Sequence, residues 1–276
     1  MSLRVERGLI WLLSLAGLLV LAWLVPSPGY MDAQYYYLGG RSLFNGQGFF
    51  EPFLWNYLND PAGLPQPSHL YWMPLPSILS WFGMLITFRG DFLGGRALFI
   101  LLASTLPLIT SAAAKIAGLD RQEIRLASLL AVFSGFYWVY LTLPETFVPT
   151  MLLGGCFLLV LIAPSVRKSA ALQALFLGLL SGLMHMTRAD GLLWLAAAGI
   201  YLFAAQWSRT DRPSKTALRI GSALFLLAAG YQLVSGAWYA RNLNLFGSFM
   251  PPGNGRALWI ENYNQTSVYP PGPLNF

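Results

Sequence analysis

The chain is dominated by long uncharged stretches rather than by a short alternation of apolar and polar residues. Each stretch is close to the ~20 apolar residues that an α-helix needs to cross a bilayer. There are eight of them, at residues 8–25, 69–88, 97–114, 126–144, 146–166, 169–187, 191–208 and 220–240. Two longer polar segments, 26–68 and 241–276, are rich in Pro, Gly, Asn and aromatic residues. The pattern predicts an all-α membrane protein.

The positions of Lys and Arg indicate how many of these stretches cross the membrane. If the N-terminus is cytoplasmic and 69–88 does not cross, 11 of the 17 basic residues lie on the cytoplasmic side. If 69–88 crosses, only 7 lie inside and 10 lie outside. Cytoplasmic loops normally carry the excess of Lys and Arg, so the first arrangement is favoured. It predicts about seven spans and an interfacial helix at 69–88, with an ordinary span that has a Pro-rich start as the alternative.

This topology treats residues 1–276 as one domain, with a long outer loop at 26–92 and an outer C-terminal segment at 241–276. Arg4 and Arg7 precede the first stretch, as they would in a signal peptide. No small-residue cleavage site follows that stretch, so we expect a retained anchor. The sequence contains no convincing internal repeat.

Composition agrees with a membrane location. Hydrophobic residues make up 56% of the chain and charged residues 10%, whereas soluble proteins average roughly 25% charged residues. Lys and Arg outnumber Asp and Glu by 17 to 11, which the cytoplasmic loops explain. No basic run interleaved with aromatic residues indicates a nucleic-acid partner. The single cysteine, Cys156, lies in an apolar run and is expected only to pack.

Several charged residues lie at the predicted outer ends of the spans. They come from four separate connections and are Asp32, Glu145, the pair Arg188 and Asp190, and Arg241. Charge next to hydrocarbon is costly unless it is paired or hydrated, and its retention indicates a functional site. Interfacial anchors and helix caps, with Arg188 and Asp190 pairing locally, are the structural alternative.

Five motifs occur along the chain in a recognisable order. They are Pro28-Gly-Tyr-Met-Asp32 followed by Leu43-Phe-Asn-Gly46, His69-Leu-Tyr-Trp-Met-Pro74-Leu75, Leu143-Pro-Glu145, Thr187-Arg188-Ala-Asp190-Gly191 and Trp238-Tyr-Ala-Arg241-Asn242. In order, spacing and sidedness they resemble motifs of the GT-C membrane glycosyltransferases. The nearest branch is the bacterial one related to protein O-mannosyltransferases and aminoarabinose lipid A transferases. The resemblance covers nearly the whole chain and departs from the family pattern in the extra residues between His69 and Pro74.

The resemblance implies a GT-C-like bundle and an inverting sugar transfer. The donor would be a polyprenyl-phosphate sugar, and the acceptor a hydroxyl of a glycan, lipid or protein. The reaction would take place in the cell envelope, on the outer face of the plasma (inner) membrane. Asp32 is the expected general base, because an alcohol needs a carboxylate to remove its proton. Glu145 would orient the acceptor or, with Asp32, hold a divalent metal, and the metal requirement stays open.

The departing phosphate needs cationic hydrogen-bond donors, and arginine supplies them in pairs. Arg188 and Arg241 are therefore expected to share one phosphate, with Arg96 as a third candidate. His69 would either contact the phosphate or act as an interfacial hydrogen-bonding group. His185, inside an apolar stretch, is expected to be a core histidine.

Aromatic side chains are dense in the first outer loop. Tyr71 and Trp72 would stack on sugar faces or form part of the interfacial aromatic belt found in membrane proteins.

Two other functions fit the pattern. A transporter or flippase of lipid-linked sugars would use the outer charges along a substrate path, although transporters often contain repeats. A catalytic half without turnover is the other, because GT-C relatives usually continue through further spans beyond a segment like 241–276.

Overall fold

The computed structural model describes residues 3–133, 135–163, 169–207 and 213–272, and most of these residues are helical. The α-helices are α1 (Leu3–Leu24), α2 (Met31–Phe44), α3 (Leu75–Thr87), α4 (Phe92–Ser104), α5 (Leu106–Ile116), α6 (Arg121–Val132), α7 (Phe147–Ile162), α9 (Ala170–Thr187), α10 (Leu192–Trp207), α11 (Pro213–Phe246) and α12 (Pro252–Ala257). Three 3₁₀ helices are η1 (Gly135–Thr142), η2 (Ala189–Gly191) and η3 (Tyr263–Ser267). Strands β1 (Phe50–Glu51) and β2 (Gln66–Pro67) pair antiparallel.

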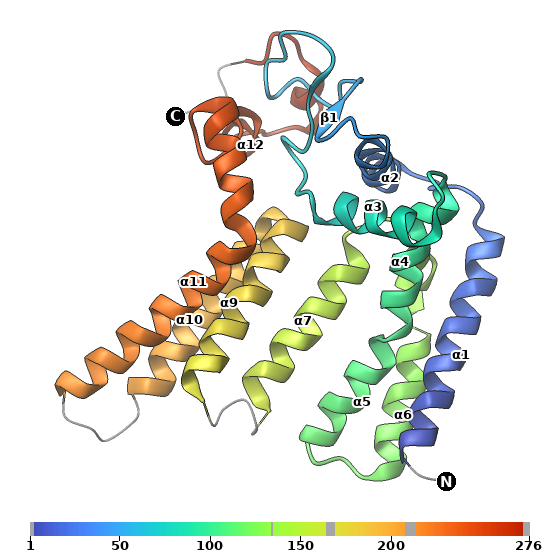
Figure 1. The fold of residues 1–276 in the computed structure, drawn as a ribbon, viewed down its shortest axis with the longest axis vertical. Coiled ribbons are helices and arrows are strands. Elements are labelled where there is room, and N and C mark those ends of the chain that lie inside the picture. The colour runs from blue at the N-terminus through green and yellow to red at the C-terminus, as the bar shows by residue number, and fades with distance from the viewer. Residues whose placement is uncertain (1–2, 134, 164–168, 208–212, 273–276) are drawn as a thin grey trace.

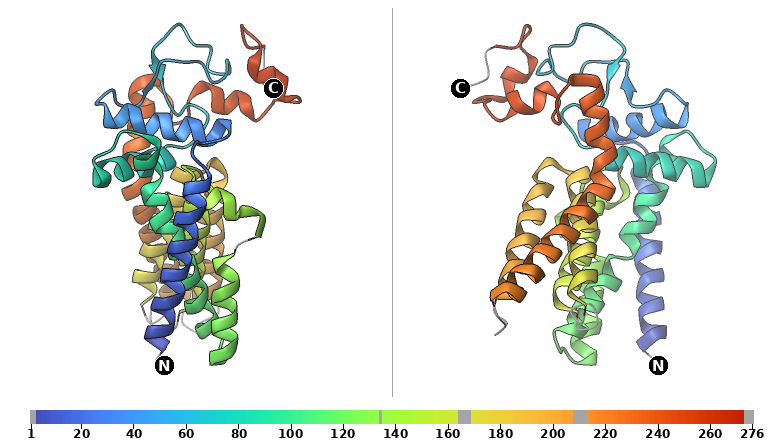
Figure 2. Two further views of the ribbon diagram at one scale, coloured as in Figure 1. Left: turned by 90° about the vertical axis from the view of Figure 1, so that its right-hand side faces the viewer. Right: turned by 60° about the vertical axis from the view of Figure 1, so that its left-hand side comes forward.

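The helices form a bundle with a separate layer at one end (Figure 1). Helices α1, α4, α5 and α6 pack together, α9, α10 and α11 form a second group, and α7 contacts both groups. Residues 26–91 and 247–272, here termed the crown, cover one end of the bundle, and within the crown α2 and α3 lie across the long helices (Figure 2).

Glycines allow the closest helix contact in the bundle, between α9 and α11. A Cβ atom on Gly178 would overlap the carbonyl oxygen of Leu227, and one on Gly230 would overlap that of Leu175. Small residues at such positions let two helix backbones approach closely, which is a common means of helix association in membranes. This contact fixes the wall of the bundle that carries Arg188 and Trp238.

Five described helices are long and apolar enough to cross a membrane, or up to six if the bent pair formed by α6 and η1 is one span. Helix α7 is apolar but has only 16 residues. These helices identify the chain as an all-α membrane protein, and the count of seven spans stays a prediction. Helices α4 and α5 together form one 25-residue candidate span, Phe92–Ile116, where 97–114 was expected.

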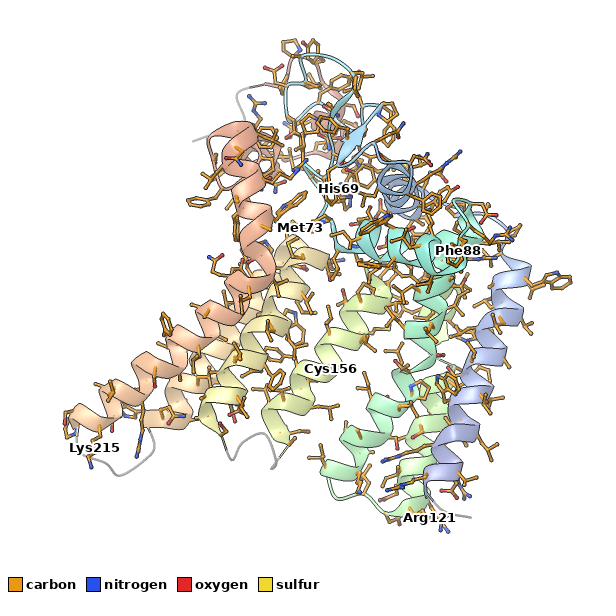
Figure 3. All side chains as sticks on the ribbon, in the orientation of Figure 1. His69, Met73, Phe88, Arg121, Cys156 and Lys215 are labelled. Carbon is orange, nitrogen blue, oxygen red and sulfur yellow. The ribbon has the colours of Figure 1, made fainter. Side chains whose placement is uncertain are left out.

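The two ends of the bundle can be told apart by the residues that lie there. Arg121 and Lys215 lie at the end opposite the crown, and the N-terminus lies there too, whereas His69 and Phe88 both lie at the crown end (Figures 1 and 3). The two ends of the stretch 69–88 are thus on one side of the bundle, as the interfacial interpretation requires.

The helix within that stretch is shorter than predicted. It begins at Leu75 rather than at residue 69. Residues 69–74 cannot continue it, because His69 has a positive φ of 58° and the residue before Pro74 is biased away from helical geometry. The non-helical segment instead delivers Tyr71, Trp72 and Met73 to the space between the crown and the bundle.

A small apolar cluster joins the crown to the bundle. Met73 from the crown packs with Met186 of α9 and Trp238 of α11. All three side chains are buried, so their packing holds the crown against the second group of helices.

Candidate functional site

A cavity of about 500 Å³ lies between the crown and the ends of the bundle helices. Figure 3 shows Met73, one of its lining residues, between the crown and α9 and α11. Six segments contribute to the lining: the start of α2, residues 71–73, residues 145–146, residues 185–192 from α9 to α10, the last turns of α11, and residues 249–258. Most predicted site residues meet here although they are far apart in sequence.

Asp32 projects from the first turn of α2. Gly29, with φ of 79°, turns the chain after α1, and Met31 is the first helical residue. The N-cap position is Tyr30, and no side chain caps the helix, so Asp32 does not have the capping role that would explain it structurally. Burial raises the pKa of Asp32, and the positive charge of Arg188 opposes that rise. The carboxylate makes no hydrogen bond with the described residues and is open to the cavity.

Glu145 also lines the cavity, just before α7. Its side chain is only 4% exposed. Oε1 accepts a hydrogen bond of 2.8 Å from the Thr146 hydroxyl, and Oε2 has no partner among the described residues. Burial raises the pKa of Glu145, and the nearby charge of Asp32 raises it further. The charges of the two carboxylates therefore interact with each other.

Arg188 supplies the cationic group of the cavity. It follows the last residue of α9, and its Nε donates to Asp190 Oδ1 at 3.0 Å while Nη2 donates to Oδ2 at 3.1 Å. This is the local pair expected from the sequence. Both side chains are about half exposed, so the pair contributes little to stability. Nη1 makes no hydrogen bond with the described residues and is free to bind a ligand.

Arg241 does not line the cavity, contrary to the expected sharing of a phosphate with Arg188. Its Nη2 donates to the carbonyl oxygens of Ser68 at 2.9 Å and Phe49 at 3.3 Å. The guanidinium also stacks on Trp238, at 4.3 Å from the ring centroid. Arg241 thus holds the ends of the β1–β2 segment against α11, and Trp238 faces the cavity in its place.

Arg96 and His69 also lie outside the lining. Arg96 is 3% exposed and donates to the carbonyl oxygens of Ala22 and Val25, where a cation favourably meets the C-terminus of α1. His69 is 2% exposed, and its two ring nitrogens each lie 2.8 Å from a serine hydroxyl, of Ser68 and of Ser77. Burial lowers the pKa of His69 to about 3, so the ring is neutral. In this arrangement both residues serve the fold, and neither can reach a phosphate in the cavity.

Tyr71 and Trp72 line the cavity as the sequence predicted. Their rings are 4.5 Å apart, and Trp72 also contacts Trp55 at 4.6 Å between centroids. Rings held in such a cluster keep their faces in fixed orientations, as stacking on a sugar requires.

Further residues line the cavity beside the predicted ones. Tyr36 belongs to the aromatic residues of the first outer loop, which were expected to stack on sugar faces or to form the interfacial belt, and it lies one helical turn after Asp32. His185, expected to be a core histidine, lines the cavity together with Tyr239.

The C-terminal wall of the cavity had no sequence signal. Phe249 and its neighbours reach the cavity because this segment binds to distant parts of the crown. The Gly253 N–H donates to Asn59 Oδ1 at 2.8 Å, and Arg256 donates to the Leu58 carbonyl oxygen at 2.7 Å. These partners are separated by more than 190 positions.

The described residues do not form a metal centre of their own. No group of three or more His, Cys, Asp or Glu side chains gathers among them. Asp32 and Glu145 offer two carboxylates. In proteins Mg²⁺ is usually held by one or two carboxylates together with substrate phosphate and water, so the two side chains supply part of such a ligand set and not the whole of it.

No protein-family model, no curated protein and no solved structure matches the chain. The fold and the cavity define a helical membrane protein with a polar site at one end of its bundle.

Proposed function

We propose that this protein is an inverting glycosyltransferase that moves a sugar from a polyprenyl-phosphate donor to an acceptor hydroxyl. The observation that carries the proposal is that two carboxylates and a guanidinium group from three elements line one cavity. They are Asp32 of α2, Glu145 just before α7, and Arg188 at the end of α9, and the charge of Arg188 acts on the pKa of both carboxyl groups. A hydroxyl that must lose a proton suits the carboxylates, and a phosphate that must leave suits the guanidinium group.

The reaction follows from these groups. Asp32 accepts the proton of the acceptor hydroxyl while the oxygen of that hydroxyl forms a bond to the anomeric carbon of the donor sugar. The bond from that carbon to the phosphate oxygen breaks on the opposite face, and its electron pair leaves with the polyprenyl phosphate. Arg188 stabilises the developing negative charge through the free Nη1. The raised pKa of Asp32 makes its carboxylate a stronger base than that of an exposed aspartate.

The remaining lining fits the other parts of the substrates. Glu145 is placed to hold the acceptor hydroxyl beside Asp32, and Tyr71 and Trp72 offer ring faces to the sugar. Met250 and Leu258, both apolar and exposed, border the cavity and suit the first isoprene units of the donor. A cavity at one end of the bundle favours an enzyme over a transporter, whose site lies near the membrane midplane. The distribution of Lys and Arg favours a position of the crown, and with it of the reaction, on the outer face of the plasma (inner) membrane.

Asp32→Asn tests the proposal. Asparagine keeps the size and polarity of aspartate but cannot accept the proton, so we expect turnover to fall by roughly 100-fold or more. The assay measures polyprenyl phosphate released from a panel of hexose- and aminopentose-charged polyprenyl phosphates by purified protein in lipid vesicles, to which lipid, glycan and protein acceptors are added in turn. Release that depends on an added acceptor reports transfer, whatever sugar the protein uses.

Asp60→Asn is the matched control, because Asp60 is exposed in the crown and does not line the cavity. It should leave turnover unchanged. If Asp32→Asn turns over at the wild-type rate, Asp32 is not the general base. Passage of an intact donor across the vesicle membrane without release would favour a transporter.

A further inference from the structure

His185 belongs to a cluster of three hydrogen-bonded rings at the cavity. Its Nδ1 lies 2.6 Å from the Tyr231 hydroxyl, which lies 2.6 Å from the Tyr239 hydroxyl. The Tyr239 hydroxyl is also 3.4 Å from the same Nδ1. The His185 and Tyr231 rings are nearly parallel, with an interplanar angle of 8°. The close packing of α9 on α11 brings these side chains together.

The cluster fixes which nitrogen of His185 carries the proton. A neutral imidazole nitrogen is a much better proton acceptor than a phenolic oxygen, and a phenol is a good donor. The hydrogen bonds therefore run from Tyr239 to Tyr231 and from Tyr231 to Nδ1. Since Nδ1 accepts, the neutral ring carries its proton on Nε2.

That Nε2–H is open to the cavity. It makes no hydrogen bond with the described residues, and it is not among the buried polar atoms that are sealed from solvent. His69 shows the contrast within the same protein, because both of its nitrogens meet serine hydroxyls. A histidine that served only the core would be satisfied in the same way.

The position of His185 indicates what this donor would bind. His185 and Arg188 lie on the same side of the cavity, on the last turn of α9 and directly after it. The Thr187 hydroxyl between them points back along α9 and donates to the Leu183 carbonyl oxygen at 2.8 Å. It does not accept a hydrogen bond from the Nε2–H of His185. A ring N–H beside a guanidinium group suits an anionic oxygen.

We propose that the Nε2–H of His185 binds a phosphate oxygen next to Arg188, with Tyr231 as a positioning residue that holds the imidazole tautomer. The identification of that phosphate with the departing group of a lipid-linked sugar rests on the proposed function. The binding of phosphate itself does not, and it can be measured without an acceptor or turnover.

The test is calorimetric titration of the full-length protein in detergent with farnesyl phosphate, and separately with inorganic phosphate. His185→Gln keeps an N–H near the position of Nε2, whereas His185→Asn keeps one only near Nδ1. We expect His185→Asn to weaken farnesyl phosphate binding by about tenfold or more, the usual scale for a charge-assisted hydrogen bond. His185→Gln should stay within about threefold of wild type.

Tyr231→Phe separates positioning from packing. It should weaken binding in the wild-type background but not in the His185→Gln background, since a glutamine amide has no tautomer to hold. Similar melting temperatures of the variants establish that they are folded.

Unchanged affinity in His185→Asn would overturn the proposal, and so would equal weakening in His185→Asn and His185→Gln. Tighter binding of farnesyl phosphate than of inorganic phosphate would assign the site to a lipid phosphate, and equal binding to free phosphate. If sugar transfer fails with every donor while His185-dependent phosphate binding persists, the proposed function falls and this site stands.

Discussion

Arg188 and Arg241 are both arginines near helix ends, yet their surroundings give them different tasks. Arg188 has an exposed partner, Asp190, and a free Nη1 that faces the cavity. Arg241 is held by two backbone carbonyl oxygens and an aromatic ring. The acceptors of Arg241 are main-chain atoms of residues more than 170 positions away, which no side-chain pattern reveals.

This difference predicts opposite effects of two alanine substitutions. Arg241→Ala should lower the melting temperature, because it removes hydrogen bonds of a charged donor worth roughly 1.5–3 kcal/mol each, and it should alter farnesyl phosphate affinity less. Arg188→Ala should weaken farnesyl phosphate binding by about tenfold or more with little change in melting temperature.

Arg89→Ala is the matched control, since Arg89 forms an exposed pair with Asp91 outside the cavity. It should change neither quantity appreciably. A large loss of phosphate affinity in Arg241→Ala at an unchanged melting temperature would return Arg241 to the binding site.

Charge at the predicted span ends was a sound guide to some site residues and a poor guide to others. Glu145 and Arg188 line the cavity because they border ends of α7 and α9 that face the crown, and Asp32 lines it from the first turn of α2 within the crown. Arg96 and His69 also carry polar groups near span ends, but the fold uses those groups against the α1 carbonyls and buried serines. The sequence shows where polar groups occur and not whether a buried partner already occupies them.

At the scale of elements, the β1–β2 segment contains a buried acid. Glu51 of β1 accepts a hydrogen bond of 2.8 Å from Gln66 of β2, and its second oxygen has no partner among the described residues. Burial raises the pKa of Glu51 to about 7, although the neighbouring side chains of Tyr35 and Gln66 and the charge of Arg241 act in the opposite direction. The folded protein therefore holds this proton more tightly than the unfolded chain does.

This shift predicts a specific loss of stability with rising pH. The stabilisation by the retained proton is complete below the ordinary pKa near 4.5 and is lost as pH rises through about 7. The melting temperature of wild type should therefore fall more between pH 5 and pH 8 than that of Glu51→Gln, which cannot ionise. The difference corresponds to a few kcal/mol at most.

Glu261→Gln serves as the control, because Glu261 is exposed. It should follow the wild-type curve. Parallel curves for wild type and Glu51→Gln would show that Glu51 does not retain its proton in the folded state.

The helices of the bundle were predictable because their signal is local and long. The uncharged stretches 169–187 and 191–208 matched α9 and α10 closely. The stretch 8–25 overlaps α1, 220–240 lies inside the longer α11, and 97–114 lies inside the span formed by α4 and α5. The predicted start of α3 at residue 69 was wrong, and the helix begins at Leu75. Pro74 and the positive φ of His69 prevent helical geometry in the six residues before it, although the stretch is apolar. The crown was not predictable in detail, because hydrogen bonds between its two distant segments hold it together.

At the scale of the whole molecule, the distribution of charge predicts how the protein sits in the membrane. Gly63, where a Cβ meets no atom within 4 Å, and Phe88, which is 92% exposed, lie in the crown before and after α3. In a Cys156→Ser background, cysteines at both positions should react with a membrane-impermeant maleimide on intact cells. A cysteine at Lys215, which is at the opposite end of the bundle (Figure 3), should react only after permeabilisation.

Labelling at positions 63 and 88 from opposite sides would mean that α3 crosses the bilayer. The orientation and the site assigned to the outer face would then both fail.

The docking of the C-terminal segment on the crown has a consequence for biosynthesis. Asp32 leaves the ribosome about 217 residues before the wall at 249–258 begins to emerge. At about 5–20 residues per second, the interval between them is on the order of 10–40 s. During that time the nascent chain can insert its helices and carry the carboxylates of the site without the segment that closes the cavity. The cavity is therefore completed only when Gly253 and Arg256 reach Asn59 and Leu58, after helices α1 to α11 have been made.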